Sequence, residues 1–233
     1  MKRILIIGGS SGMGLATAKL AAKHHEVIIA SRSQAKLDNA KKEIDGKAVS
    51  TAIVDTRDEV SIKKLFQFLG KIDHLVMPGS EVQFGNIKNS TVAVVKESFD
   101  SKFFGPFRMV QVALNYLNPE GSITFFSGGA GTKPQKGTEI LSAINAAVEG
   151  FAKALALSLA PIRVNTIAPG IIDTPVYDGI DEATKNLFKQ FTDSLLIKRM
   201  GTAEEAAKAA LYLIDNDYVT GTVMYVDGGY VIS

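Results

Sequence analysis

Three glycines near the amino terminus have a spacing that suits the binding of a phosphate group. Gly8, Gly12 and Gly14 follow an apolar run at residues 4–7 and open a segment with helical patterning. Gly8 permits a tight turn, Gly12 lets the backbone approach a ligand, and Gly14 lets the helix pack closely on the strand. The unpaired N–H groups at the start of such a helix attract a pyrophosphate, although a purely structural turn is the alternative. The residues predicted to hold the diphosphate of a dinucleotide are Gly8, Ser10, Ser11, Gly12, Met13 and Gly14.

The end of the second apolar run carries a basic residue where an acidic one would select NAD. An Asp or Glu at this point binds the ribose 2′-hydroxyl of NAD, but no acid lies between residues 27 and 37. The guanidinium of Arg32 instead suits a 2′-phosphate. We therefore predict that Ser31 and Arg32 contact the cofactor and that NADP(H) is preferred over NAD(H). The alternative is that Arg32 is a solvated surface residue.

Short runs rich in Ile and Val alternate with longer helical patterns along the whole chain. Near-continuous apolar runs are typical of strands that are buried on both faces of a parallel sheet. The pattern predicts a single α/β domain over residues 1–233, a Rossmann-like doubly wound parallel sheet of about seven strands in a three-layer α/β/α arrangement. The strands are expected at 4–7, 27–30, 48–54, 74–77, 122–126, 164–168 and 222–226, and the helices at 12–23, 35–44, 60–69, 92–117, 140–159 and 204–214.

Residues 177–199 interrupt this alternation with an additional helical pattern between the sixth and seventh predicted strands. Insertions near the carboxyl ends of the strands often cover the ligand crevice of an open α/β sheet. We predict that this segment covers the substrate, and a surface helical hairpin without a ligand role is the alternative.

The composition excludes several other classes of function. The chain has 46% hydrophobic and 21% charged residues and a net charge of +2, so no strong field would draw it to nucleic acid or to a membrane. It contains no Cys, which excludes disulfides and fits a reducing compartment, so a cytoplasmic location is expected. The three His residues lack a metal-ligand spacing, and no metal site is predicted. We also expect no stretch as long as a membrane span.

Several ordered motifs resemble those of the short-chain dehydrogenase/reductase family over nearly the whole chain. The glycine spacing is similar to that of the family, and Asp55 resembles its adenine-contacting Asp. The stretch that includes Pro169, Gly170, Ile172 and Thr174 resembles the one that shapes the nicotinamide pocket. The resemblance implies hydride transfer between a nicotinamide cofactor and a small organic substrate, in a homodimer or homotetramer.

The chain departs from this family at the catalytic positions. The family uses a Tyr as general acid/base, a Lys that lowers the Tyr pKa and holds the ribose, a Ser that orients the substrate, and an Asn that supports a water. The matching positions here are Leu141, Asn145, Gly128 and Lys102, in that order, with Ser127 beside Gly128. Leu cannot move a proton, and an uncharged Asn cannot lower a neighbour's pKa as a Lys does.

Ser127 and Lys102 remain as candidate catalytic residues. A partly desolvated Lys can act as an acid, although a surface lysine is the alternative. Without the Tyr, reduction would slow least for acceptors that need no proton from it, such as quinones or activated alkenes. Two further hypotheses stay open at this point: a catalytically inactive nucleotide-binding protein, and a structural subunit that pairs with an active homologue.

Overall fold

The computed structural model describes residues 1–46, 48–82, 87–179 and 181–233, without the side chains of residues 176, 183–185 and 187. Its centre is a seven-stranded sheet in the order β3-β2-β1-β4-β5-β6-β9, and every neighbouring pair is parallel. This arrangement confirms the predicted Rossmann-like doubly wound fold. The strands are β1 (Arg3–Ile7), β2 (Glu26–Ser31), β3 (Val49–Ile53), β4 (Ile72–Met77), β5 (Leu117–Phe126), β6 (Arg163–Pro169) and β9 (Val223–Val226).

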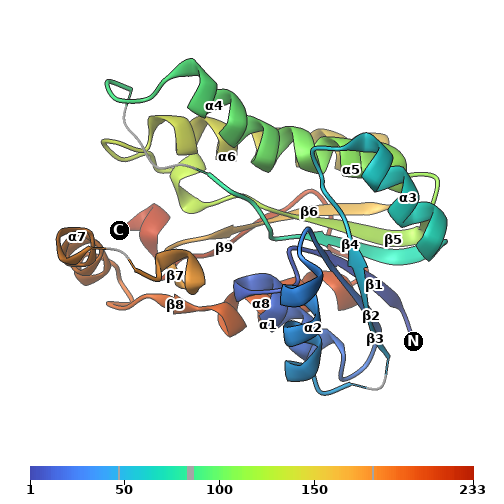
Figure 1. Ribbon diagram of the computed structural model, residues 1–233. Coiled ribbons are helices and arrows are strands. Elements are labelled where there is room, and N and C mark those ends of the chain that lie inside the picture. Colours follow the sequence, from blue (N-terminus) through green and yellow to red (C-terminus); the bar gives the residue numbers. More distant parts are fainter. Residues whose placement is uncertain (47, 83–86, 180) are drawn as a thin grey trace.

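Helices cover both faces of this sheet (Figure 1). Successive residues of β1 alternate between two hydrophobic cores, with Leu5 and Ile7 in one and Ile4 and Ile6 in the other. Both faces are therefore buried, which explains why the strands read as unbroken apolar runs. One helix layer contains α3 (Glu59–Leu69), α4 (Val92–Phe99), α5 (Gly105–Ala113) and α6 (Glu139–Ser158), and the other contains α1 (Gly12–Ala21), α2 (Gln34–Glu43) and α8 (Ala203–Asp215).

The predicted continuous helix at 92–117 is wrong in detail. The structure has α4, then a π-helical segment η1 (Asp100–Phe104), then α5, and residue 117 already belongs to β5. The N–H of Gly105 bonds to the carbonyl of Asp100, five residues back. Pro106, in the first turn of α5, has no N–H to continue an α-helical ladder, which favours an interruption here. A π-helical turn inside a helix frequently marks a functional site.

The insertion that interrupts the alternation contains α7 (Glu182–Asp193), near the carboxyl terminus of the chain in Figure 1. A separate two-stranded parallel pair, β7 (Ile172–Asp173) with β8 (Gly201–Thr202), joins the two ends of this excursion. Residue 180 and several side chains of the predicted covering segment lie outside the described residues.

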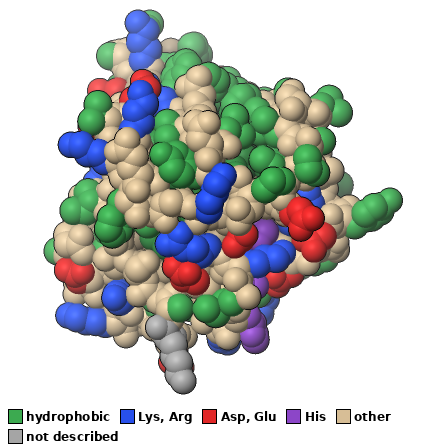
Figure 2. Space-filling model, turned by 90° about the vertical axis from the view of Figure 1, so that its right-hand side faces the viewer, with side chains coloured by type: hydrophobic (Ala, Val, Ile, Leu, Met, Phe, Trp, Pro, Cys, Tyr) green, Lys and Arg blue, Asp and Glu red, His purple; other side chains and the backbone are tan. Residues whose placement is uncertain are grey.

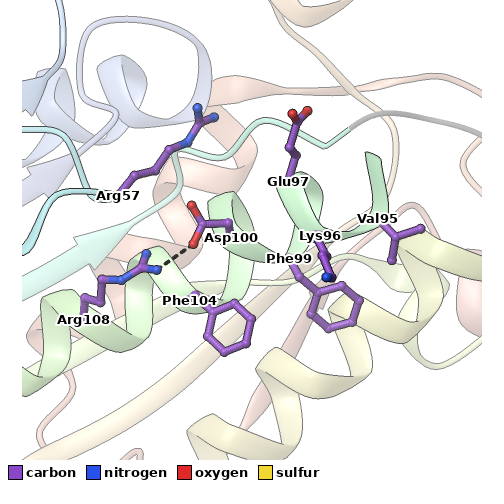
Figure 3. Close-up of a pocket in the computed structure, with 8 residues that line it drawn as sticks. All are labelled: Arg57, Val95, Lys96, Glu97, Phe99, Asp100, Phe104 and Arg108. Carbon is purple, nitrogen blue, oxygen red and sulfur yellow. Dashed lines mark hydrogen bonds and ion pairs between the residues drawn. The ribbon is translucent and has the colours of Figure 1, made fainter. Parts of the chain in front are cut away.

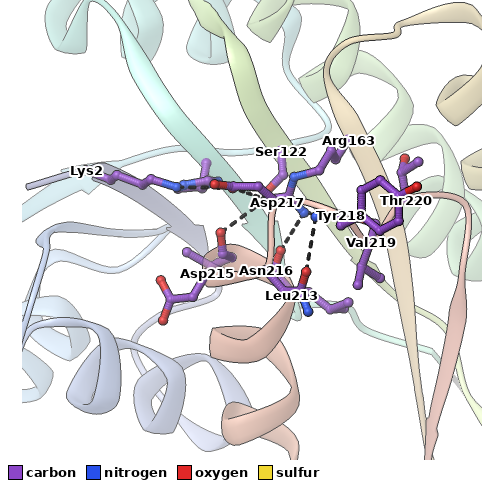
Figure 4. A network of polar contacts seen from close by, with 12 residues as sticks. Lys2, Ser122, Arg163, Leu213, Asp215, Asn216, Asp217, Tyr218, Val219 and Thr220 are labelled. Carbon is purple, nitrogen blue, oxygen red and sulfur yellow. Dashed lines mark hydrogen bonds and ion pairs between the residues drawn. The ribbon is translucent and has the colours of Figure 1, made fainter.

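A buried arginine connects β6 to the end of α8 (Figure 4). The guanidinium of Arg163 donates to the carbonyl oxygens of Leu213 and Ile214 at 2.7 and 3.1 Å, and to Val219 at 3.1 Å. Carbonyls at a helix C-terminus have no partner within the helix, so this cation satisfies them and complements the helix dipole. Arg163 is the first residue of β6, so this network lies at the amino-terminal edge of the sheet. Figure 2 shows basic and acidic side chains interspersed on this side of the molecule.

Helix α6 is apolar over most of its length. Among the described residues it is long and apolar enough to cross a membrane, judged by length and composition alone. The expectation that no stretch reaches this length is therefore wrong for α6. One third of its most apolar 18-residue window is buried inside the protein, where Ile144, Val148 and Ala152 pack in the cores. A helix that covers the core of a soluble protein passes the same test.

Candidate nucleotide-binding and catalytic site

The glycine turn follows β1, which pairs with β4 at the point where the strand order reverses direction. Gly8 has a φ of 79°, and a Cβ there would lie 2.5 Å from the Cα of Gly79, which follows β4. A Cβ on Gly14 would lie 2.2 Å from the carbonyl oxygen of Gly8. Both positions therefore accept only glycine without a backbone shift. Ligands of open α/β sheets bind in the crevice formed at this reversal of strand order.

The first turn of α1 lacks a side-chain cap, as α5 and α6 do, whereas α2, α3, α4 and α8 have one. Ser33, Asp58 and Thr202 cap α2, α3 and α8 through hydrogen bonds to backbone N–H groups, whereas Ser11 makes no such bond at the start of α1. The N–H groups at this helix end are thus available to a ligand, and the dipole favours an anion. This arrangement fits a pyrophosphate.

Of the residues expected around the nicotinamide, Thr174 lies beside this turn. Pro169 ends β6, and Gly170 packs so closely on Asp227 that a Cβ would lie 2.9 Å from its Cα. Ile172 is buried in β7. The methyl carbon of Thr174 lies 3.4 Å from the Cβ position of Gly12, so the fold brings the predicted pyrophosphate turn next to part of the predicted nicotinamide pocket.

The predicted 2′-phosphate site contains two residues that the sequence reasoning missed. Ser31 ends β2, and the following Arg32 forms an ion pair with Glu81 from the segment after β4. Asp55 accepts a hydrogen bond from the backbone N–H of Arg57 at 2.9 Å, and the Arg57 side chain also binds Glu81 at 2.9 Å. Only the adjacency of the strand ends could have linked Glu81 to Arg32, because 49 residues separate them in sequence.

Lys102 extends from the π-helical segment toward the end of β5. Its ammonium donates a hydrogen bond to the backbone carbonyl of Ser127 at 2.8 Å. Burial lowers the pKa of Lys102 to about 8, and the nearby carboxylate of Glu149 opposes part of this shift. A group with this pKa can exchange protons near neutral pH.

Ser127 is directed toward the interior. Its hydroxyl donates to Oε1 of Glu149 at 2.8 Å, and both residues are buried. Glu149 lies on α6, two turns after the Leu141 position. In the sequence Glu149 is only a polar position on a largely apolar helix, so its burial beside Ser127 gave no signal that sequence reasoning could use.

Gly128 and Asn145 lie so close together that each limits which residue can stand at the other position. A Cβ on Gly128 would lie 2.8 Å from Nδ2 of Asn145, so a Ser could not enter this position without displacing the amide. Asn145 is 1% exposed, and its Oδ1 has no hydrogen-bond partner among the described residues. A buried acceptor without a partner is costly, so this atom is suited to a hydroxyl donated by a ligand.

Aromatic contacts link residues of the segment 177–199 to one another and to the carboxyl terminus. The rings of Tyr177 and Phe188 lie 5.0 Å apart, as do those of Phe191 and Tyr230. Burial raises the pKa of Tyr177 above its ordinary value. The hydroxyl of Tyr230 donates to the carbonyl of Lys133 at 2.5 Å, which fixes the loop after β5.

A cavity of about 620 Å³ opens outside α4, η1 and α5 (Figure 3). Its walls include Phe99, Phe104 and Arg57, together with an ion pair of 2.7 Å between Arg108 and Asp100. Neither predicted catalytic residue lines it. Arg57 also contacts Asp55, so this cavity adjoins the predicted adenine-binding residue and not Lys102.

Comparison with known proteins agrees with this geometry. A family model described as enoyl-(acyl carrier protein) reductase matches residues 8–231. The chain belongs to the short-chain dehydrogenase/reductase family. The short-chain dehydrogenase/reductase ATR9 of Stachybotrys chlorohalonatus is 32% identical to this chain. The alignment covers 97% of this chain and 95% of ATR9.

Solved structures of the family match over the full chain. A small-chain dehydrogenase in complex with NADPH has a TM-score of 0.83 at 32% identity and covers 100% of this chain and 99% of its own. A variant of the actinorhodin polyketide ketoreductase with NADPH has a TM-score of 0.90 at 26% identity. The match covers 100% of this chain and 98% of the ketoreductase chain. The chain is thus similar to oxidoreductases that bind a nicotinamide cofactor.

Proposed function

We propose that this chain is an NADP(H)-dependent oxidoreductase that transfers hydride to or from a small organic substrate and uses Lys102 to move the proton. The observation that carries the proposal is the ammonium of Lys102, which lies 2.8 Å from the carbonyl of Ser127 with its pKa lowered to about 8. It replaces the acid that Leu141 cannot supply. The glycine turn that we propose binds the cofactor also lies at the carboxyl-terminal edge of the sheet.

The proposed contacts cover the cofactor from its adenine end to its nicotinamide end. Arg32 binds the 2′-phosphate and Asp55 the adenine, and the NADPH of the two similar structures supports this preference. The glycine turn and α1 bind the pyrophosphate. Pro169, Gly170, Ile172 and Thr174 shape the nicotinamide pocket. Oδ1 of Asn145 accepts a hydrogen bond from a ribose hydroxyl, which satisfies this buried atom.

The proton balance assigns a role to each polar side chain. The bound nicotinamide cofactor supplies the hydride for reduction. The substrate atom that gains negative charge then takes one proton from Nζ of Lys102, which solvent later restores. Ser127 acts as a positioning residue, because its carbonyl holds the ammonium and its hydroxyl holds Glu149. The segment 177–199 shields this reaction from water.

We also propose that the chain forms a homodimer or homotetramer through α6. Its outward face carries small side chains and Leu157, which is 86% exposed. Small residues let a second helix approach closely, and association would bury this apolar surface.

Nucleotide binding without catalysis is the second candidate function. The coupled Gly128 and Asn145 positions favour it, because the structure cannot simply recover the family's Ser beside this amide. Such a protein would be an inactive nucleotide sensor or a structural partner of an active homologue.

Nicotinamide fluorescence and absorbance distinguish these functions. We expect the purified protein to bind NADPH more tightly than NADH and to consume NADPH with a quinone or an activated alkene. Lys102→Met should retain NADPH binding and lose at least about 100-fold in turnover. Lys63→Met, at an exposed ion pair, is the control. Full turnover by Lys102→Met would remove this residue from the mechanism, and absent turnover in every protein would favour the second candidate.

A further inference from the structure

Three charged side chains converge where β2 and β3 end. Arg32 comes one residue after β2, Arg57 lies after β3, and Glu81 follows β4. Nη2 of Arg32 pairs with Oε1 of Glu81, and Nη2 of Arg57 lies 2.9 Å from Oε2 of the same carboxylate. Each oxygen of Glu81 therefore binds a different guanidinium.

We propose that Glu81 is an internal competitor for the 2′-phosphate of NADP(H), held in an anion site that Arg32 and Arg57 form together. This inference rests on the proposed function and extends it with two specificity-determining residues. Arg57 is the second guanidinium for the phosphate, and Glu81 occupies the site until the phosphate displaces it.

The chemistry of the three groups supports this competition. A phosphate and a carboxylate offer similar pairs of oxygens to guanidinium groups, and both form charge-assisted hydrogen bonds. A phosphate near neutral pH carries up to two charges, so two arginines favour it over one carboxylate. The 2′-hydroxyl of NAD(H) is uncharged and cannot compete with Glu81 in this way. Glu81 thus lowers affinity for NADP(H) without a matching effect on NAD(H).

Because the cluster is exposed, displacement of the Glu81 carboxylate costs little free energy. The side chains of Arg32, Arg57 and Glu81 are 52%, 42% and 60% exposed. Ion pairs at such exposure are screened by water and contribute little to stability. Releasing Glu81 therefore costs little beside the contacts that the phosphate gains.

The backbone of Glu81 is anchored while its carboxylate is exposed. Its N–H donates to the hydroxyl of Ser101 at 2.8 Å, and Ser101 is buried in η1. Rotation of the Glu81 side chain is thus sufficient to open the anion site. The same π-helical segment contains Lys102. One segment therefore positions both the specificity residue Glu81 and the proposed proton donor.

Fluorescence titration of the full chain with NADPH and with NADH tests the competition. Glu81→Gln should lower the Kd for NADPH about three- to tenfold, the range expected for two exposed ion pairs, and leave the Kd for NADH unchanged. Arg57→Gln should raise the Kd for NADPH about tenfold and spare NADH. Glu204→Gln, at an exposed ion pair with Lys208, is the charge-matched control and should change neither.

The outcomes separate this inference from the proposed function. Weaker NADH binding by Glu81→Gln would show that Glu81 binds the ribose hydroxyls instead, and would overturn the competition. Unchanged Kd values for both nucleotides in Glu81→Gln would also overturn it, while the proposed function would stand. Failure of the unaltered protein to bind either nucleotide would refute both.

Discussion

Replacing Lys102 by Met should stabilise the protein at neutral pH, because it removes a charge from the interior. Burial lowers the pKa of Lys102 from 10.5 to about 8, and this difference corresponds to about 3 kcal/mol of unfolding free energy at pH 7. Loss of the hydrogen bond from Nζ to the Ser127 carbonyl offsets about 1 kcal/mol of that gain. Lys102→Met should therefore be more stable than the unaltered protein by about 2 kcal/mol at pH 7.

The sign of the pH dependence follows from proton counting. Between pH 8 and 10.5 the unfolded chain binds more protons at this lysine than the folded chain does, so the unaltered protein gains stability as pH rises. The advantage of Lys102→Met should thus fall by about 2.5 kcal/mol between pH 7 and pH 10. Titration of Tyr177 and Tyr230, whose pKa values burial raises, is common to both proteins and cancels in the difference.

Urea unfolding followed by circular dichroism at pH 7 and pH 10 measures this difference. The control is Lys63→Met, which removes an exposed ammonium that pairs with Glu59 and leaves the interior unchanged. A Lys102→Met variant that is less stable than the unaltered protein by the same amount at both pH values would refute the reasoning. The lysine would then be charged and well solvated in the folded state.

Three further predictions test the fold and the site. Gly14→Ala should abolish NADPH binding measured by fluorescence and lower the melting temperature, because its Cβ would lie 2.2 Å from the carbonyl oxygen of Gly8. Arg163→Met should reduce the urea-measured unfolding free energy by about 3 kcal/mol or more, since it leaves the carbonyls at the end of α8 without donors; a loss below about 1 kcal/mol would contradict this role. Burial lowers the pKa of His74 to about 3. The contribution of His74 to the unfolding free energy should therefore be complete above pH 6.5 and fall by roughly 4 kcal/mol as pH decreases to 3. His74→Gln should lack this component in an acid titration, whereas the exposed His24→Gln should retain it.

The fold was predictable because its strands are buried on both faces. Residues such as Ile4, Leu5 and Ile6 are all fully buried, so no polar residue interrupts the apolar run. The break in the helix at 92–117 was less visible, because a π-helical turn preserves apolar patterning on either side. Pro106 was the local sign of the interruption, and its position in the first turn of α5 explains it.

The geometry of the glycine turn could be predicted from adjacent residues, whereas the charged partners could not. Gly8, Gly12 and Gly14 act through local backbone geometry, which spacing alone reveals. Glu81 and Glu149 act on groups 49 and 22 residues away, and an isolated Glu in a sequence indicates only a polar position. Such pairings depend on which strand ends and helix faces meet, and only the assembled sheet determines that.

The π-helical segment makes the effect of a deletion depend on its position. An α-helix rotates by about 100° per residue, so removal of one residue from the middle of α4 or α5 would turn the apolar face of that helix away from the core. The turn in η1 contains one residue more than an α-helical turn, because its hydrogen bond joins residues five apart. Removal of one residue from Asp100–Phe104 would therefore leave an α-helical turn and let Met109 stay in the core, but it would change the direction of Lys102 relative to the carbonyl of Ser127.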